Sequence, residues 1–111
     1  MKARDIYANA LASLGYTDGP EFKQKAIVII NKVYLELFQK VKHGKTFDPI
    51  KTLNDEIDLP LNVIIGVMNS GIAELLALGE GDGELQQYYA FDYDRGKKKL
   101  SSIDTVIDAL P

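Results

Sequence analysis

The feature that most constrains this chain is its most apolar stretch, residues 58–81, which reads DLPLNVIIGVMNSGIAELLALGEG. Asp58 is a suitable N-cap, and Pro60 suits the first turn, where its missing N–H would have no helical partner. The spacing predicts a helix of about five turns at the centre of the fold. One face of this helix is defined by large apolar residues that recur at helical spacing: Leu61, Ile64, Ile65, Met68, Ile72, Leu75 and Leu76.

Small residues form a second line along the same stretch: Gly66, Ser70, Ala73 and Ala77. Such a line lets another backbone approach closely, so that dispersion contacts fill the space that large side chains would occupy. Gly66 and Gly71 each cost roughly 1 kcal/mol relative to Ala inside a helix, and close packing is the expected compensation. The neighbour is either another helix of this chain or a second copy of the protein. We expect Gly66→Leu to destabilise the fold by overpacking.

Two helices are predicted before this stretch. The first spans residues 3–14 and ends at Gly15, and its apolar positions follow the helical template: Ala3, Ile6, Tyr7, Ala10, Leu11 and Leu14. The second and longest runs from about residue 19 to 43. Asp18 as N-cap and Glu21 three residues later are typical of a capping box.

A further helix and a connector complete the prediction. The last helix starts after the N-cap Asp82 and is expected to fade near Gly96; the tail, residues 100–111, is either a short helix or an extended arm. Residues 45–59 form an ordered loop whose apolar anchors are Phe47, Ile50, Leu53 and Ile57. The sequence therefore predicts an all-α fold: one domain, residues 1–111, built as a bundle of about four helices with a C-terminal arm.

Composition excludes several classes of site. The chain has 111 residues, a net charge of −3, no cysteine and a single histidine, His43, so disulfides and sites that need two imidazoles are excluded. Residues 1–15 are amphipathic and carry Arg4 and Asp5, which is not the pattern of a signal peptide. Polar residues interrupt the central apolar stretch, so its uninterrupted apolar run is shorter than the ~20 residues that a membrane span requires. We predict no catalytic residue, metal, cofactor or membrane contact.

Three groups of surface residues are candidates for contacts with partners. Val28 and Leu35 lie one heptad apart near the polar side of the second helix. They are either single exposed residues or part of a subunit contact. Ile103, Val106 and Ile107 in the tail either fray or dock on a neighbour. The third group is a basic cluster that consists of Arg95, Lys97, Lys98 and Lys99. It has three interpretations: solvated charge, contact with an acidic partner, or contact with DNA phosphate.

The order of four segments resembles a known family. LASLGYTDG, KAIVIINKVYLEL, FDPIKTLNDEIDLP and the run GVMNSGIAELLALGEGDGELQQYYAFDYDRGKKKL, together covering about residues 10–100, look like the head–tail connector (adaptor, or head-completion) proteins of tailed bacteriophages and prophages. The most specific part is the helix of small residues followed by an acidic glycine turn and Gln-Gln-Tyr.

The resemblance implies a helical virion protein without enzymatic activity, assembled as a homo-oligomeric ring at the portal vertex. Its partners would be the portal and tail-completion proteins, with at most weak contact with DNA. Its location would be the virion, or the bacterial cytoplasm when it is expressed from a prophage. A small helical regulatory or DNA-binding module of a mobile element is the alternative.

Overall fold

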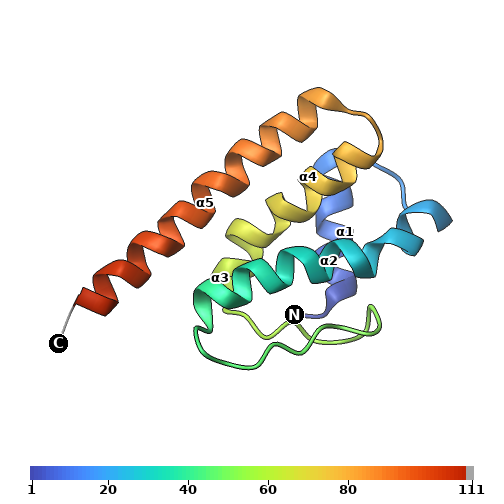
Figure 1. Cartoon of the computed structure of the whole chain (residues 1–111). Coiled ribbons are helices and arrows are strands. Elements are labelled where there is room, and N and C mark those ends of the chain that lie inside the picture. Colours follow the sequence, from blue (N-terminus) through green and yellow to red (C-terminus); the bar gives the residue numbers. More distant parts are fainter. Residues whose placement is uncertain (110–111) are drawn as a thin grey trace.

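The computed structural model describes the backbone of residues 1–109 and the side chains of residues 1–100, and over that range it contains no strand. Its elements, in order, are α1 (Ala3–Leu14), α2 (Pro20–Val41), α3 (Leu61–Val63), the π-helical turn η1 (Ile64–Met68), α4 (Asn69–Gly79) and α5 (Gly83–Ala109). Because α3, η1 and α4 follow one another without a break, the chain forms a bundle of four helical rods (Figure 1). The predicted all-α class is confirmed.

Helix α1 forms as its pattern predicts. All six of its predicted apolar positions are buried. A short amphipathic helix is stable mainly because its apolar face packs on other elements. Gly15 ends the helix with φ 72°, a left-handed conformation that glycine adopts without steric cost. Tyr16 then stacks on Phe22 of α2 with ring centroids 5.6 Å apart, which joins the turn to the next helix.

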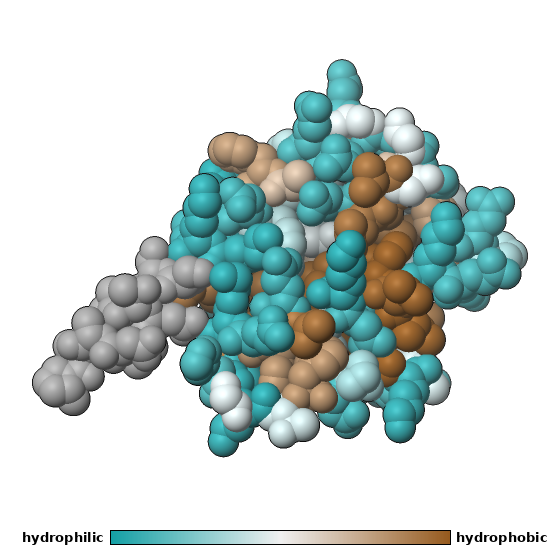
Figure 2. Space-filling view, viewed as in Figure 1, coloured by the Kyte–Doolittle hydropathy of each residue, from teal (hydrophilic) through white to brown (hydrophobic). Residues whose placement is uncertain are grey.

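Helix α2 buries one face, which includes Ala26, Ile30 and Leu37, but it starts differently from the prediction. Gly19 is the N-cap, Pro20 follows it, and no side chain caps the helix, so the predicted capping box is wrong. Asp18 is used elsewhere: it accepts a hydrogen bond from the Tyr7 hydroxyl at 2.6 Å and lies 3.7 Å from the Lys23 ammonium. On the viewed side of the molecule, apolar residues gather beside α2 (Figure 2).

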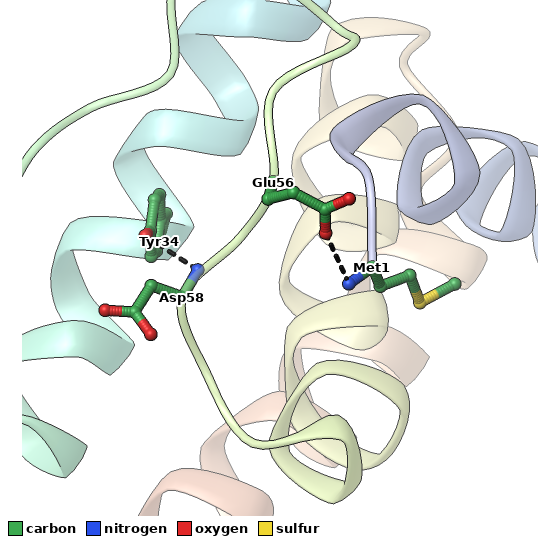
Figure 3. Close-up of polar contacts among 4 residues, drawn as sticks. All are labelled: Met1, Tyr34, Glu56 and Asp58. Atoms are coloured by element: carbon green, nitrogen blue, oxygen red, sulfur yellow. Dashed lines mark hydrogen bonds and ion pairs between the residues drawn. The ribbon is translucent and has the colours of Figure 1, made fainter.

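The connector between α2 and α3 is an ordered loop, as predicted. Ile50 and Ile57 are buried in the core, and the Asn31 side chain exchanges two hydrogen bonds with the backbone of Ile50, at 2.8 and 2.9 Å. Further along, the Tyr34 hydroxyl accepts a hydrogen bond from the Asp58 N–H, and the Met1 amino group pairs with Glu56, both at 2.9 Å (Figure 3). These contacts fix the loop against α2 and the start of the chain.

The central helix lies in the core as predicted, but Leu61 and Ile65 of its predicted apolar face are each 58% exposed, and its start and its register differ. Pro60, not Asp58, is the N-cap, and Asp58 lies 3.3 Å from Lys42 instead. The turn η1 contains one residue more than an α-helical turn, which rotates the following residues by about 100° relative to a regular helix. The residues before and after η1 therefore do not form the single face that an α-helical period predicts.

This shift decides which glycine is closely packed. Gly66 is exposed, and a Cβ added to it would have no atom within 4 Å, so the predicted burial of Gly66 is wrong. Gly71, where close packing was also expected, is buried, and a Cβ there would lie 2.8 Å from the Tyr93 ring and 2.9 Å from Val33. The other members of the small-residue line, Ser70, Ala73 and Ala77, are buried as expected.

Helix α5 is longer than predicted. Asp82 does cap it, because its carboxylate accepts a hydrogen bond from the Leu85 N–H at 3.4 Å. The helix does not fade at Gly96 but continues to Ala109 and extends beyond the rest of the bundle (Figure 1). Gly96 marks a close approach rather than an end, since a Cβ there would lie 3.0 Å from Val67. The tail is thus helical as far as the structure describes it.

Candidate interaction surfaces

The exposed side of α2 carries the first candidate surface. Val28 is 70% exposed and Leu35 is 39% exposed, and their seven-residue spacing places them on the same face of the helix. Lys25, Lys32 and Gln39 on this face are also exposed. The structure therefore confirms that Val28 and Leu35 are accessible, and their use in a subunit contact stays a prediction.

The second candidate surface lies at the end of α5. Ile103, Val106 and Ile107 belong to the part of α5 whose backbone is helical but whose side chains lie outside the described residues. In sequence, Ile103 and Ile107 follow Leu100 at helical spacing, and Leu100 packs against the core. Their contacts with a neighbour stay a prediction.

The basic cluster is largely paired with acids of the same chain. Arg95 lies 3.0 Å from Asp92, Lys97 lies 3.3 Å from Glu36, and Lys98 lies 3.2 Å from Asp94. Exposed pairs of this kind contribute little to stability, but each carboxylate cancels a positive charge that phosphate would need. The local field therefore favours at most weak contact with nucleic acid.

A hollow lies beside the basic cluster, between η1 and α5. It measures about 710 Å³ including open solvent, and Val63, Val67, Arg95 and Lys99 are among its lining residues. Asp92 also lines it but accepts a hydrogen bond from the buried Ser70 hydroxyl. The hollow is thus lined by both apolar and basic side chains.

His43 is exposed just beyond the end of α2. Within residues 1–100, no three or more His, Asp or Glu side chains are grouped so that they could hold a metal ion.

A polar group that joins α5 to α2 was not predicted from the sequence. Tyr93 is only 5% exposed, its hydroxyl donates to Glu36, and the Lys97 ammonium lies 4.4 Å from its ring centroid. Burial disfavours the charge of Glu36, but hydrogen bonds from Tyr93 and Lys97 outweigh it and hold the pKa of that carboxyl below its usual value. The sequence signal was Gly71, whose missing side chain leaves room for the Tyr93 ring.

Two tyrosines predict a loss of stability at alkaline pH. Burial, and then a hydrogen bond to a carboxylate, raise the pKa of Tyr93 and of Tyr7 above the ordinary value of about 10. The unfolded chain therefore loses these protons first, so their stabilising contribution is complete below about pH 10 and declines as the pH rises further. Each tyrosine costs up to about 1.4 kcal/mol per pH unit in that range.

Urea unfolding at pH 8 and at pH 11 measures this effect. Tyr93→Phe removes one ionisable hydroxyl and is expected to reduce the alkaline loss. Tyr88→Phe is the control, because Tyr88 is 65% exposed. Equal alkaline losses in the wild type and in Tyr93→Phe would contradict the prediction.

The outer side of α5 carries a third surface. The helical spacing of the aromatic residues in this part of the sequence predicts that they line the edge of the core. This prediction is correct for Tyr93 and for the half-buried Tyr89, whose hydroxyl donates to the Ser13 carbonyl at 3.0 Å. It is wrong for Tyr88 and Phe91, which are 65% and 69% exposed.

Contrary to the expectation from its polar residues, the segment Leu61–Gly79 has the length and apolar content of a membrane span, with a mean hydropathy of 1.7. However, 56% of its most apolar window is buried inside the fold. A buried core helix meets the same criterion.

Comparisons with protein-family models, with curated proteins and with solved structures gave no match. The chemistry and placement of the candidate surfaces are therefore the basis for a functional proposal.

Proposed function

We propose that this protein is a structural component of a tailed phage or prophage virion, a head–tail connector subunit that forms a ring at the portal vertex and has no enzymatic activity. The resemblance over about residues 10–100 motivates the proposal. The observation that carries it is the shape of α5, a helix of 27 residues that extends beyond the bundle, together with the exposure of Val28 and Leu35 on α2.

A ring requires two different patches on each subunit, because its contacts are head-to-tail. In the proposed ring, the α2 surface with Val28 and Leu35 receives the end of a neighbour's α5, which carries Ile103, Val106 and Ile107. Apolar residues at both patches would be removed from water, which favours association. The two patches lie on different helices, as this arrangement needs.

The charges suit a ring through which DNA passes. The chain has a net charge of −3, and most of its basic cluster is paired with Asp92, Asp94 and Glu36. Tight binding would retain the DNA, whereas a weakly charged lumen lets it move. In this proposal the protein binds the portal and tail-completion proteins, contacts no membrane, and occurs in the virion or in the cytoplasm of a host that expresses the prophage.

Deletion of the gene, followed by complementation and electron microscopy of the particles, tests the proposal. The wild type is expected to restore tailed particles, whereas the double variant Val28→Glu, Leu35→Glu is expected to leave DNA-filled heads without tails. Leu78→Glu is the matched control, since Leu78 is 60% exposed on α4, away from both patches in the sequence.

Mass spectrometry of purified particles provides the second readout. Tailed, infectious particles that form without this protein and do not contain it would overturn the proposal. Binding of duplex DNA by the isolated protein, with an affinity that falls steeply with salt, would instead favour a regulatory DNA-binding module.

A further inference from the structure

The outer face of α5 combines exposed aromatic rings with charges of opposite sign at its two ends. Glu84, Tyr88, Phe91 and Arg95 follow one another at intervals of four, three and four residues and are all exposed. At this spacing they form one stripe along the helix. Tyr88 and Phe91 in its middle are 65% and 69% exposed, so the single chain leaves both rings largely in water.

The stripe has the same spacing in both directions, which fits an antiparallel pair of identical helices. If two copies of α5 lie antiparallel with a two-fold axis midway between residues 89 and 90, Tyr88 faces Phe91 of the second copy. The same register places Glu84 opposite Arg95 of the second copy, and symmetry produces each contact twice. A parallel pair would instead place Glu84 against Glu84 and Arg95 against Arg95.

The side chain of Arg95 is already positioned for this contact. It lies 3.0 Å from Asp92 of its own helix, and its guanidinium is 5.7 Å from the centroid of the Phe91 ring. A guanidinium has five N–H donors, so it can keep Asp92 and still donate to a second carboxylate. The flanking charges Asp94 and Lys98 pair with each other at 3.2 Å and do not oppose the approach.

We propose that two copies of this protein associate through the outer face of α5 as an antiparallel, two-fold symmetric dimer. Aromatic contacts lie at its centre and a Glu84–Arg95 ion pair lies at each end. The contact between two single helices is smaller than the ~1,200–2,000 Å² of stable interfaces, so the dimer forms at high protein concentration and weakens with salt.

This inference does not rest on the proposed function. A two-fold contact uses the same face on both copies, whereas ring assembly uses the α2 surface and the end of α5. Failure of one set of experiments therefore leaves the other unaffected.

Charge reversal tests both the surface and the direction of pairing. Sedimentation equilibrium is expected to show a reversible dimer for the wild type, with a dissociation constant at least about tenfold higher for Glu84→Arg and for Arg95→Glu, because each variant places two like-charged pairs in the contact. An equimolar mixture of the two variants is expected to dimerise again, since every Arg then faces a Glu. Lys45→Glu, an exposed charge reversal in the connector, is the control and is expected to behave as the wild type.

A mixture that stays monomeric while the wild type dimerises would overturn the antiparallel arrangement, and a monomeric wild type at millimolar concentration would overturn the dimer. Cross-linking gives a second measurement that does not depend on reversed charges. The chain has no cysteine, so Glu84→Cys mixed with Arg95→Cys is expected to form a disulfide-linked heterodimer in preference to either homodimer. Equal yields of all three dimers would contradict the proposed register.

Discussion

Gly71→Leu is expected to lower the free energy of unfolding by about 3 kcal/mol or more. A Cβ at this position would lie 2.8 Å from the Tyr93 ring and 2.9 Å from Val33, distances that real Cβ atoms do not show. Neither neighbour moves easily, because the Tyr93 hydroxyl is bound to Glu36 and the side chain of Val33 is branched at Cβ. Urea unfolding followed by circular dichroism measures the change.

Gly66 provides the matched control for this prediction, since it lies in the same helical rod. Gly66→Ala is expected to be neutral or to stabilise the fold by up to about 1 kcal/mol, because alanine favours a helix over glycine and the site has open space. Gly71→Ala gains the same propensity but meets both neighbours, and we expect a net loss of about 1–2 kcal/mol. The reverse order of the two alanine variants would show that the close packing lies at Gly66, as the regular helical period predicts.

The sequence predicted the elements that have one polar and one apolar side. The apolar positions of α1 follow a helical period without interruption, and all six are buried; in α2, Ala26, Ile30 and Leu37 recur at helical spacing and are buried too. The connector was predicted for a related reason, since apolar residues such as Ile50 and Ile57 in a polar loop are stable only when they contact the core. In each case the pattern lies within one segment of the chain, and a single orientation of that segment buries its apolar residues.

The errors arise where tertiary contacts decide. An extra residue in η1 changes the hydrogen-bond register without a sequence signal comparable to a proline, so Gly66 was placed on the buried face. Gly96 was interpreted as the end of α5, although it allows that helix to approach Val67. A glycine inside a helix is ambiguous in sequence, because an end and a close contact both favour it.

The surfaces were only partly predictable for the same reason. Val28 and Leu35 were identified because they interrupt a polar side of α2. Helix α5 instead has aromatic residues on two sides, and only the position of η1 and α4 shows that Tyr93 is covered while Tyr88 and Phe91 are not. Aromatic residues on two sides of a helix do not indicate which side the fold will bury.

Tyr93→Ala is the second substitution with a large expected effect, a loss of about 3–5 kcal/mol in the free energy of unfolding. The ring is 5% exposed and fills the space beside Gly71, so its removal leaves a cavity between α2, α4 and α5. It also takes a donor from Glu36 and the aromatic face from Lys97. Urea unfolding of purified protein measures the loss, and Tyr88→Ala, on the exposed side of α5, is expected to change stability by less than about 0.5 kcal/mol.

Two further variants separate the contribution of the Tyr93 ring to stability from that of its hydroxyl and test its contact with Gly71. Tyr93→Phe keeps the ring over Gly71 and loses one hydrogen bond, so a loss of only about 1 kcal/mol is expected while Lys97 still pairs with Glu36. Combining Gly71→Leu with Tyr93→Ala places the added side chain in the space that the ring has left. The double variant should therefore be more stable than the sum of the two single losses predicts, by at least about 1 kcal/mol. Additive losses would mean that the two residues do not share one contact, and the close packing of α4 against α5 at this point would then be wrong.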